Sequence, residues 1–329
     1  MNNETIAMPP YRRTLVIEDT VDAYDALMRR CAGLEPIPTA IAHPCEEVAL
    51  AGPIDAAKAG LIVPILVGPA NKIHAVAEQS GLDIGPYQIV DVPHSHAAAA
   101  KAVELVRSGE AELLMKGSLH TDELLAEVVN RQTGLRTERR ISHAFLLDVP
   151  TYDKVLLVTD AAINIAPDLK AKRDICQNAI DLARALGVEQ PKVAILSAVE
   201  TINPDIPSTI DAAALCKMAE RGQITGGILD GPLALDNAIS REAAKTKGIR
   251  SAVAGQADIL LVPDLEAGNI LAKQLTFLNR ADAAGIVLGA RVPIILTSRA
   301  DSVRTRMASC GVAVLLAHGR RAQREVQVS

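Results

Sequence analysis

Aromatic side chains are nearly missing from this chain of 329 residues: it has no tryptophan, two phenylalanines and four tyrosines. Proteins that bind single-stranded nucleic acid stack the bases on aromatic rings, and this composition offers almost no such platform. The formal net charge of −5 also argues against a general attraction to nucleic acid or to an acidic membrane. We therefore expect no nucleic-acid partner, although a locally basic pocket for a phosphorylated ligand is compatible with this charge.

The cysteines are few, odd in number and scattered, and no two of them form a CxxC pair. They are Cys31, Cys45, Cys176, Cys216 and Cys310. This pattern argues against a disulfide framework and a zinc site, and it suits a reducing cytoplasm. The first 13 residues hold no apolar run suited to a signal peptide, and no run of about 18 apolar residues occurs anywhere. We expect a cytoplasmic protein without a membrane partner.

Several catalytic motifs are also absent. The chain contains no GxSxG, GxxxxGK[ST] or GxGxxG string, which weakens hydrolase, P-loop and Rossmann interpretations. His94 and His96 lie two residues apart near a helix start, and neither has a carboxylate at ligand spacing. His43, His120 and His143 are isolated in the sequence. We expect no metal ligands and assign no histidine to catalysis.

Short apolar runs do alternate with helix-patterned segments along the whole chain. Ile62–Val67 and Lys192–Leu196 are examples of such runs. Short apolar strands separated by helices indicate mostly parallel sheets that are buried on both faces. With 49% hydrophobic residues, a chain of this length is long enough to form two domains, and we place a boundary near Val149-Pro150.

Three segments combine an apolar run with a polar loop. They read GGILDGPLALDN at 226–237, DILLVPDLEAGN at 258–269 and VPIILTSRAD at 292–301. In an open α/β sheet, ligands bind beyond the carboxyl ends of the strands, so these loops are where function is expected. The last loop holds a hydroxyl, a guanidinium and a carboxylate within five residues, which is enough to bind an anion and move a proton.

The strings DGPLALDN and PDLEAGN, with MKG at 115–117, resemble the phosphate acetyl- and butyryltransferase family. The resemblance implies two α/β/α domains with mostly parallel sheets, similar to isocitrate and isopropylmalate dehydrogenases, and an active-site cleft between the domains. It places residues 1–147 and 286–329 in the first domain and residues 148–285 in the second. It also implies a homodimer that moves a short acyl group between coenzyme A and inorganic phosphate. Coenzyme A is then a substrate, and no cofactor is expected.

The resemblance assigns Ser298 and Arg299 to the acyl and phosphate groups of the substrates. A guanidinium fork binds phosphate in a bidentate manner and stays charged at any working pH. Acetyl-transferring relatives carry the proposed base aspartate further into the next helix, where this chain has Arg304, Thr305 and Arg306. Asp301 is the nearest substitute as the base. Alternatively, Ser298 or Asp301 caps the helix expected from residue 302 to 310.

The remaining candidate residues lie at other strand ends, and each has a plainer interpretation as part of a turn. Lys116 and Gly117 precede a helix and suit a phosphate cradle, but an exposed lysine in a βα turn is common. The other predicted substrate contacts are Asn164, Asp230, Pro263, Gly268 and Asn269. For these residues a role in the geometry of the loop is the first interpretation and contact with a ligand the second. Asn269 is also a candidate cap for the helix that follows it. The cluster of Arg131, Arg136, Arg139 and Arg140 suits either the phosphates of coenzyme A or a solvated loop.

Two other functions remain open. One is a metal- and NAD-dependent decarboxylating dehydrogenase, because the implied fold is shared with such enzymes. The other is a non-catalytic protein that binds acyl-CoA or acyl phosphate, which would suit the irregular position of the base. The sequence also leaves the acyl chain length open, since acetyl, propionyl and butyryl groups would all fit an alanine- and leucine-rich pocket.

Overall fold

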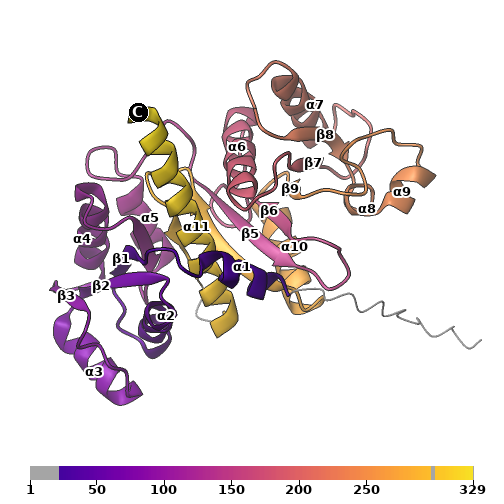
Figure 1. Ribbon diagram of the computed structural model, residues 1–329. Coiled ribbons are helices and arrows are strands. Elements are labelled where there is room, and N and C mark those ends of the chain that lie inside the picture. The colour runs from indigo at the N-terminus through magenta and orange to yellow at the C-terminus, as the bar shows by residue number, and fades with distance from the viewer. Residues whose placement is uncertain (1–21, 298–300, 329) are drawn as a thin grey trace, which may run out of the picture.

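A computed structural model describes residues 22–297 and 301–328, and this part of the chain forms one sheet of 11 strands (Figure 1). The strands are β1 (Ile37–Ala42), β2 (Ile62–Gly68), β3 (Gln88–Asp91), β4 (Leu113–Lys116), β5 (Ser142–Asp148), β6 (Leu156–Thr159), β7 (Lys192–Leu196), β8 (Ile228–Leu233), β9 (Ile259–Leu261), β10 (Asp282–Leu288) and β11 (Ile294–Ile295). Their order across the sheet is β3-β2-β1-β4-β11-β10-β5-β6-β9-β7-β8.

Most neighbouring strands are parallel, and the exceptions lie in the middle of the sheet. β10 runs antiparallel to both β11 and β5, and β5 runs antiparallel to β6. β5 and β10 pair along their full length, from Asp148 opposite Asp282 to Ser142 opposite Leu288. The predicted α/β class with mostly parallel strands is therefore confirmed, and the strands form one large sheet. This central antiparallel pair joins two parallel halves into one continuous sheet.

Strand β10 is a correction to the sequence interpretation, which placed no strand between β9 and β11. Its first residues, Asp282-Ala283-Ala284-Gly285, have little intrinsic preference for a strand. The strand forms because Ile286 and Val287 are fully buried and because β5 and β11 supply partners on both sides. Tertiary context thus decides the conformation of this segment.

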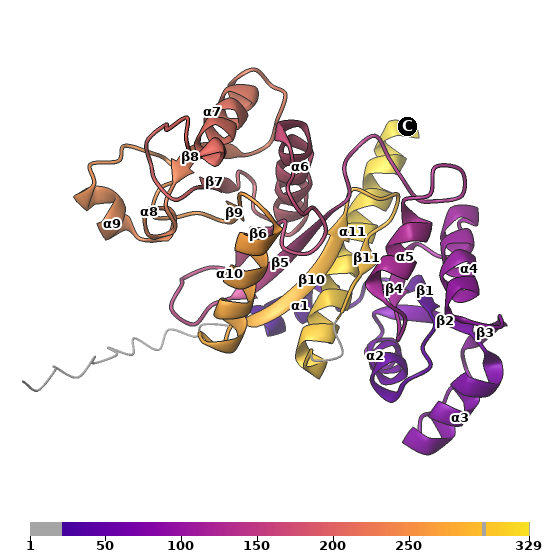
Figure 2. The same cartoon turned by 180° about the vertical axis from the view of Figure 1, so that it is seen from behind.

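Helices cover both faces of the sheet. They are α1 (Ala23–Cys31), α2 (Glu47–Lys58), α3 (Ala70–Ser80), α4 (Ser95–Ser108), α5 (Thr121–Val128), α6 (Leu169–Ala185), α7 (Pro207–Glu220), α8 (Leu235–Ile239), α9 (Arg241–Thr246), α10 (Leu265–Phe277) and α11 (Val303–Val328). One hydrophobic cluster gathers residues from α1, α2, α6, α7 and α11 on one face. On the other face, α4 and α5 pack over one half of the sheet, and α8, α9 and α10 over the other half (Figure 2).

Two further boundaries differ from the prediction and matter for the site. Asp230 was expected in a loop but lies inside β8, and Gly268 and Asn269 lie inside α10. Asp264 caps α10, since its side chain accepts a 2.8 Å hydrogen bond from the Ala267 amide, so Asn269 is not the cap. None of the helices in the described ranges is both long enough and apolar enough to cross a membrane.

Candidate functional site

The ends of β1 and β4 are tied together by a short polar network. The Ser118 hydroxyl donates to the carbonyl of His43 at 2.8 Å, and the amides of Gly117 and Ser118 reach the carbonyls of Ala42 and His43 at 2.9 Å each. A side chain at Gly117 would collide with these two carbonyl oxygens, so only glycine fits there. The close approach to β1 therefore explains why residue 117 is glycine, and the predicted part of Gly117 in a phosphate cradle stays a prediction.

Lys116 is the last residue of β4 and is partly buried. Its ammonium donates to the carbonyls of Gly117 at 3.1 Å and of Leu119 at 3.4 Å, which orients the side chain over the turn that precedes α5. Lys116 is therefore not a freely solvated surface lysine. A held ammonium at a strand end is suited to a phosphate group.

The turn after β6 is organised by the buried carboxylate of Asp160. One oxygen accepts from the amides of Ala162 at 2.9 Å and Ile163 at 3.1 Å, and the other accepts from the amide and side chain of Asn164. The Asn164 side chain also donates to the Ile141 carbonyl at 2.9 Å and accepts from Arg140 Nε at 2.7 Å. Both the oxygen and the nitrogen of the Asn164 side-chain amide are thus hydrogen-bonded, and the residue holds the shape of this turn.

The N-terminal part of α10 packs directly on the same turn. A Cβ atom at Gly268 would lie 2.7 Å from the Asp160 carbonyl oxygen and 2.8 Å from Val262 Cγ2, so the helix approaches as closely as glycine allows. Asn269 donates to the Ala161 carbonyl at 3.2 Å. Pro263 leads from β9 into Asp264, the cap of this helix. The structure therefore brings Asn164, Pro263, Gly268 and Asn269 together around Asp160.

His143 lies behind this turn and was not assigned a role from the sequence. It is fully buried on β5, and in the described structure its Nδ1 has no hydrogen-bond partner. Burial lowers the pKa of His143 to about 4, against an opposing influence of the Asp160 charge. Only the three-dimensional pairing of β5 with β6 shows this proximity, so sequence spacing carried no signal for it.

The chain that leads to the predicted catalytic loop passes the same place. A Cβ atom at Gly285 would lie 3.1 Å from His143 Nε2 and 3.6 Å from the Leu296 carbonyl oxygen. Both groups therefore lie close to the backbone of β10 at Gly285. Leu296 and Ile163, which lies in the Asp160 turn, also pack against the same hydrophobic cluster. The end of β11 and the Asp160 turn thus share a hydrophobic cluster, with β10 and β5 lying between β11 and β6.

Ser298 and Arg299 lie outside the described residues. Asp301 is described and precedes α11, and its carbonyl accepts a hydrogen bond from the Arg306 guanidinium. The cap of α11 is Ser302, whose hydroxyl accepts from the Thr305 amide at 3.0 Å. The capping alternative for Asp301 is therefore wrong, because the neighbouring serine already fills that position.

Asp230 does not join the other candidates. It lies on β8, the edge strand, opposite Ala194 of β7, and two strands separate β8 from β6. With strands spaced about 4.8 Å apart, this places it roughly 14 Å from the turn at the end of β6. Its carboxylate accepts from the Gly231 amide at 2.8 Å, which is a local arrangement of the strand.

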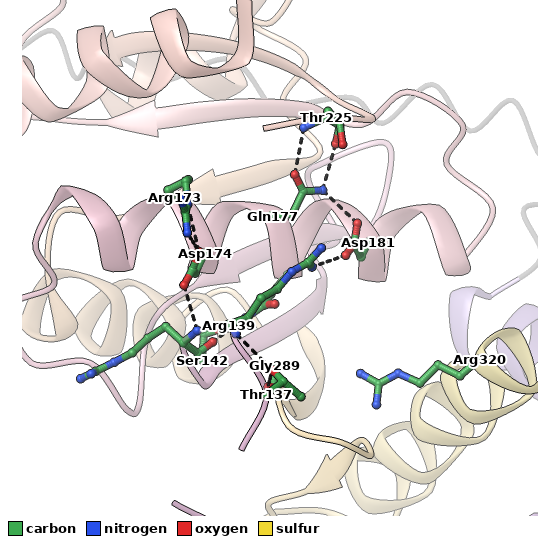
Figure 3. Close-up of polar contacts among 12 residues, drawn as sticks. Thr137, Arg139, Ser142, Arg173, Asp174, Gln177, Asp181, Thr225, Gly289 and Arg320 are labelled. Atoms are coloured by element: carbon green, nitrogen blue, oxygen red, sulfur yellow. Dashed lines mark hydrogen bonds and ion pairs between the residues drawn. The ribbon is translucent and has the colours of Figure 1, made fainter. Parts of the chain in front are cut away.

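Two arginines of the predicted cluster, Arg139 and Arg140, contact different parts of the structure. Arg140 directs Nε at Asn164. Arg139 instead pairs with Asp181 of α6 (Figure 3). Gln177 links that carboxylate to Thr225, and Arg320 of α11 extends toward Thr137 and Gly289 from the opposite side of the view. Arg139 and Arg320 line a hollow of about 1290 Å³, together with Arg184, Arg291 and the carboxylates of Glu138, Asp181 and Glu189. Arg140 is thus the member of the cluster that contacts the Asp160 turn.

Comparison with known proteins decides the family. The family model described as Phosphate acetyl/butaryl transferase matches residues 94–314, a span that contains all ten candidate residues. The chain belongs to the phosphate acetyl/butyryltransferase family. Within this family it is 68% identical over 299 residues to the phosphate acetyltransferase of Rhizobium meliloti, with 91% of this chain and 95% of the relative covered.

The family's two named activities are both represented among the relatives. The chain is 43% identical to the phosphate butyryltransferase of Clostridium acetobutylicum, covering 90% of this chain and 99% of that protein. The crystal structure of a branched-chain phosphotransacylase from Enterococcus faecalis V583 superimposes with a TM-score of 0.75 at 32% identity, covering 86% of this chain and 99% of the other. The fold and the family assignment therefore agree.

Proposed function

We propose that this chain is a phosphate acetyl- or butyryltransferase, which converts an acyl-CoA and inorganic phosphate into an acyl phosphate and free coenzyme A. The observation that carries the proposal is the 68% identity to a phosphate acetyltransferase over nearly the whole of both chains. The reaction moves an acyl group from sulfur to oxygen without changing any oxidation state. Coenzyme A and phosphate are therefore its only proposed small-molecule requirements.

In the proposed reaction, a phosphate oxygen attacks the thioester carbonyl carbon, the carbon–sulfur bond breaks, and coenzyme A leaves as a thiolate that takes up a proton. Arg299 holds the phosphate through its guanidinium fork, and the ammonium of Lys116 supports it. The Ser298 hydroxyl donates to the oxyanion of the tetrahedral intermediate. Asp301 is the proposed base that takes the proton from the coenzyme A thiol in the reverse direction.

The described residues supply the frame for this chemistry. The Asp160 turn, fixed by Asn164 and by the close approach of α10 at Gly268, shares a hydrophobic cluster with Leu296, and the proposed catalytic loop follows Leu296 in the sequence. We propose that this frame holds the acyl-CoA beside the loop. Asp230, on the edge strand, would contribute at most to the far end of a long ligand such as coenzyme A.

We also propose two domains, residues 1–147 with 286–329 and residues 148–285, facing each other across the active-site cleft as in isocitrate and isopropylmalate dehydrogenases. The antiparallel pair of β5 and β10 supports this division, because the chain crosses between the two parallel halves of the sheet there. The proposed boundary at 286 falls inside β10. Native-state hydrogen exchange with different protection in the two halves would support the division, and one uniform level would count against it.

Two proposals concern the setting of the enzyme. The five cysteines are free thiols, which suits a reducing cytoplasm. A homodimer is supported by apolar side chains that α10 presents to solvent: Ile270 and Phe277 are seven residues apart on one helix face and are 66% and 76% exposed. Leu278, directly after the helix, is 78% exposed.

Two substitutions test the proposed catalytic loop. Arg299→Lys keeps the charge but loses the bidentate fork, and we expect turnover to fall by roughly 10²-fold, the scale of removing one preorganised donor. Ser298→Ala should cost a comparable factor. Turnover and melting temperature are measured on both variants. Full activity in Arg299→Lys would remove this loop from the mechanism.

A further inference from the structure

Arg306, in the first turn of α11, carries a guanidinium that is almost completely removed from solvent. The residue is only 9% exposed, and in the described structure its Nε has no hydrogen-bond partner. One terminal nitrogen donates to the Asp301 carbonyl. A buried donor without a partner is rare in native proteins and calls for an explanation.

The surrounding elements are built to admit this side chain. A Cβ atom at Gly52 of α2 would lie 3.3 Å from Arg306 Cδ and 3.4 Å from its Nε, and Met115 of β4 closes the same space at 3.8 Å. Glycine in a helix interior costs stability relative to alanine. The missing side chain at Gly52 leaves room for Arg306 to pass between α2 and β4.

The charge of Arg306 is not balanced by a described carboxylate, since none forms an ion pair with it. Burying an unpaired cation is expensive, and the amino-terminal end of a helix adds further positive potential at this place. Its neighbour Arg304, by contrast, pairs with Asp22 and Asp282 at the surface. The surroundings of Arg306 thus favour the arrival of an anion.

We propose that Arg306 is a positioning residue of the phosphate site, an inference that rests on the proposed function. Its hydrogen bond to the Asp301 carbonyl fixes the backbone at the proposed base, and its buried charge increases the affinity of the site for inorganic phosphate. Acetyl-transferring relatives are expected to place their base aspartate in this part of the helix. In this chain, that part of the helix carries the positively charged Arg306 instead. Its charge affects the binding of phosphate rather than the binding of acyl-CoA.

The test compares Arg306→Met, Arg306→Lys and the matched surface variant Arg304→Met on the same helix. Methionine keeps the length of the buried stem and removes the charge and its donors. We expect Arg306→Met to raise the KM for phosphate by about tenfold or more, the usual effect of losing a hydrogen bond to a charged group, with the KM for acyl-CoA nearly unchanged. Arg306→Lys should recover part of the loss, and Arg304→Met should behave as the parent protein.

A binding readout separates this inference from the proposed function. Inorganic phosphate should raise the melting temperature of the parent protein, and Arg306→Met should lose most of that increase. A folded Arg306→Met protein with an unchanged KM for phosphate and an unchanged phosphate-induced shift would overturn the inference. Absence of phosphate-dependent coenzyme A release in the parent protein would instead contradict the proposed function.

Gly52→Ala keeps the inference testable if Arg306→Met does not fold. Alanine suits a helix interior better than glycine, so this variant should fold, and its methyl group would press on the Arg306 stem. We expect a smaller rise in the KM for phosphate, again without a change for acyl-CoA. An unchanged KM for phosphate in Gly52→Ala would count against the proposal.

Discussion

At the residue scale, the buried carboxylate of Asp160 fixes the turn after β6 by accepting four hydrogen bonds from Ala162, Ile163 and Asn164. The position of Thr159-Asp160 at a strand end identified this turn as a place for function. The sequence could not show that Asn164 turns its amide inward to Asp160 and Arg140, because both partners depend on the fold. The polar type of each residue was thus predictable, but its partner was not.

His143 leads to a prediction about the pH dependence of stability. Its pKa is about 4 in the native protein and about 6.5 when unfolded, so between these values the unfolded state binds a proton that the native state does not. Stability contributed by the neutral ring is therefore present above pH 6.5 and is lost as the pH falls toward 4. We expect His143→Gln to flatten this dependence by up to about 1.4 kcal/mol per pH unit.

Denaturant unfolding of both proteins at several pH values between 4.5 and 6.5 measures this difference. Burial also lowers the pKa of His43 and raises the pKa of Asp148, which shifts both groups toward this range. They are present in both proteins, so their contributions cancel in the comparison. Parallel stability profiles would show that His143 is protonated as easily in the native protein as in the unfolded chain.

At the scale of elements, the predicted strands agree best where apolar runs are continuous, as for β2 and β7. The prediction fails at Asp230 and at β10 for a common reason. Asp230-Gly231-Pro232 is typical of a turn and 282–285 of no regular element, yet the neighbouring strands pair with both segments. Backbone pairing overrides local preference there, and a single sequence does not show which strands become neighbours.

The close packing of α10 on the Asp160 turn gives the prediction at this scale. Gly268→Ala should destabilise the protein by about 1–3 kcal/mol, because the added methyl group overpacks against Asp160 and Val262. It should also lower turnover, since the turn is displaced. Gly319→Ala is the matched control in α11, where no neighbouring atom lies within 4 Å of the new methyl group. Equal melting temperatures for the two variants would show that α10 does not constrain the turn.

For the molecule as a whole, the sequence predicted an α/β fold with mostly parallel sheets in two domains, but not one large sheet that is continuous through β5 and β10. The resemblance to a family supplied the expected return of the last segment to the first half. The order β4-β11-β10 places that segment beside the strands of the first half. The apolar face of α10 could not be foreseen either, because periodicity alone does not show which helix face a neighbour covers.

The homodimer is the prediction that belongs to this scale. We expect light scattering to give about twice the 34.7 kDa mass of one chain. Phe277→Glu should shift the protein toward the monomer, because it places a charge in the apolar face of α10. Val129→Glu, on the partly exposed end of α5, is the control and should leave the mass unchanged. A single 34.7 kDa species for the parent protein at micromolar concentration would contradict the homodimer.

The most direct test of the central claim is a thiol-release assay over acetyl-, propionyl- and butyryl-CoA, each with and without inorganic phosphate. A phosphate acyltransferase releases coenzyme A only when phosphate is present, and an equal amount of acyl phosphate accumulates. The order of the rates gives the preferred chain length. Binding of acyl-CoA without phosphate-dependent release would indicate a non-catalytic protein, and NADH formation from a hydroxy-diacid would indicate a dehydrogenase; either result would contradict the account.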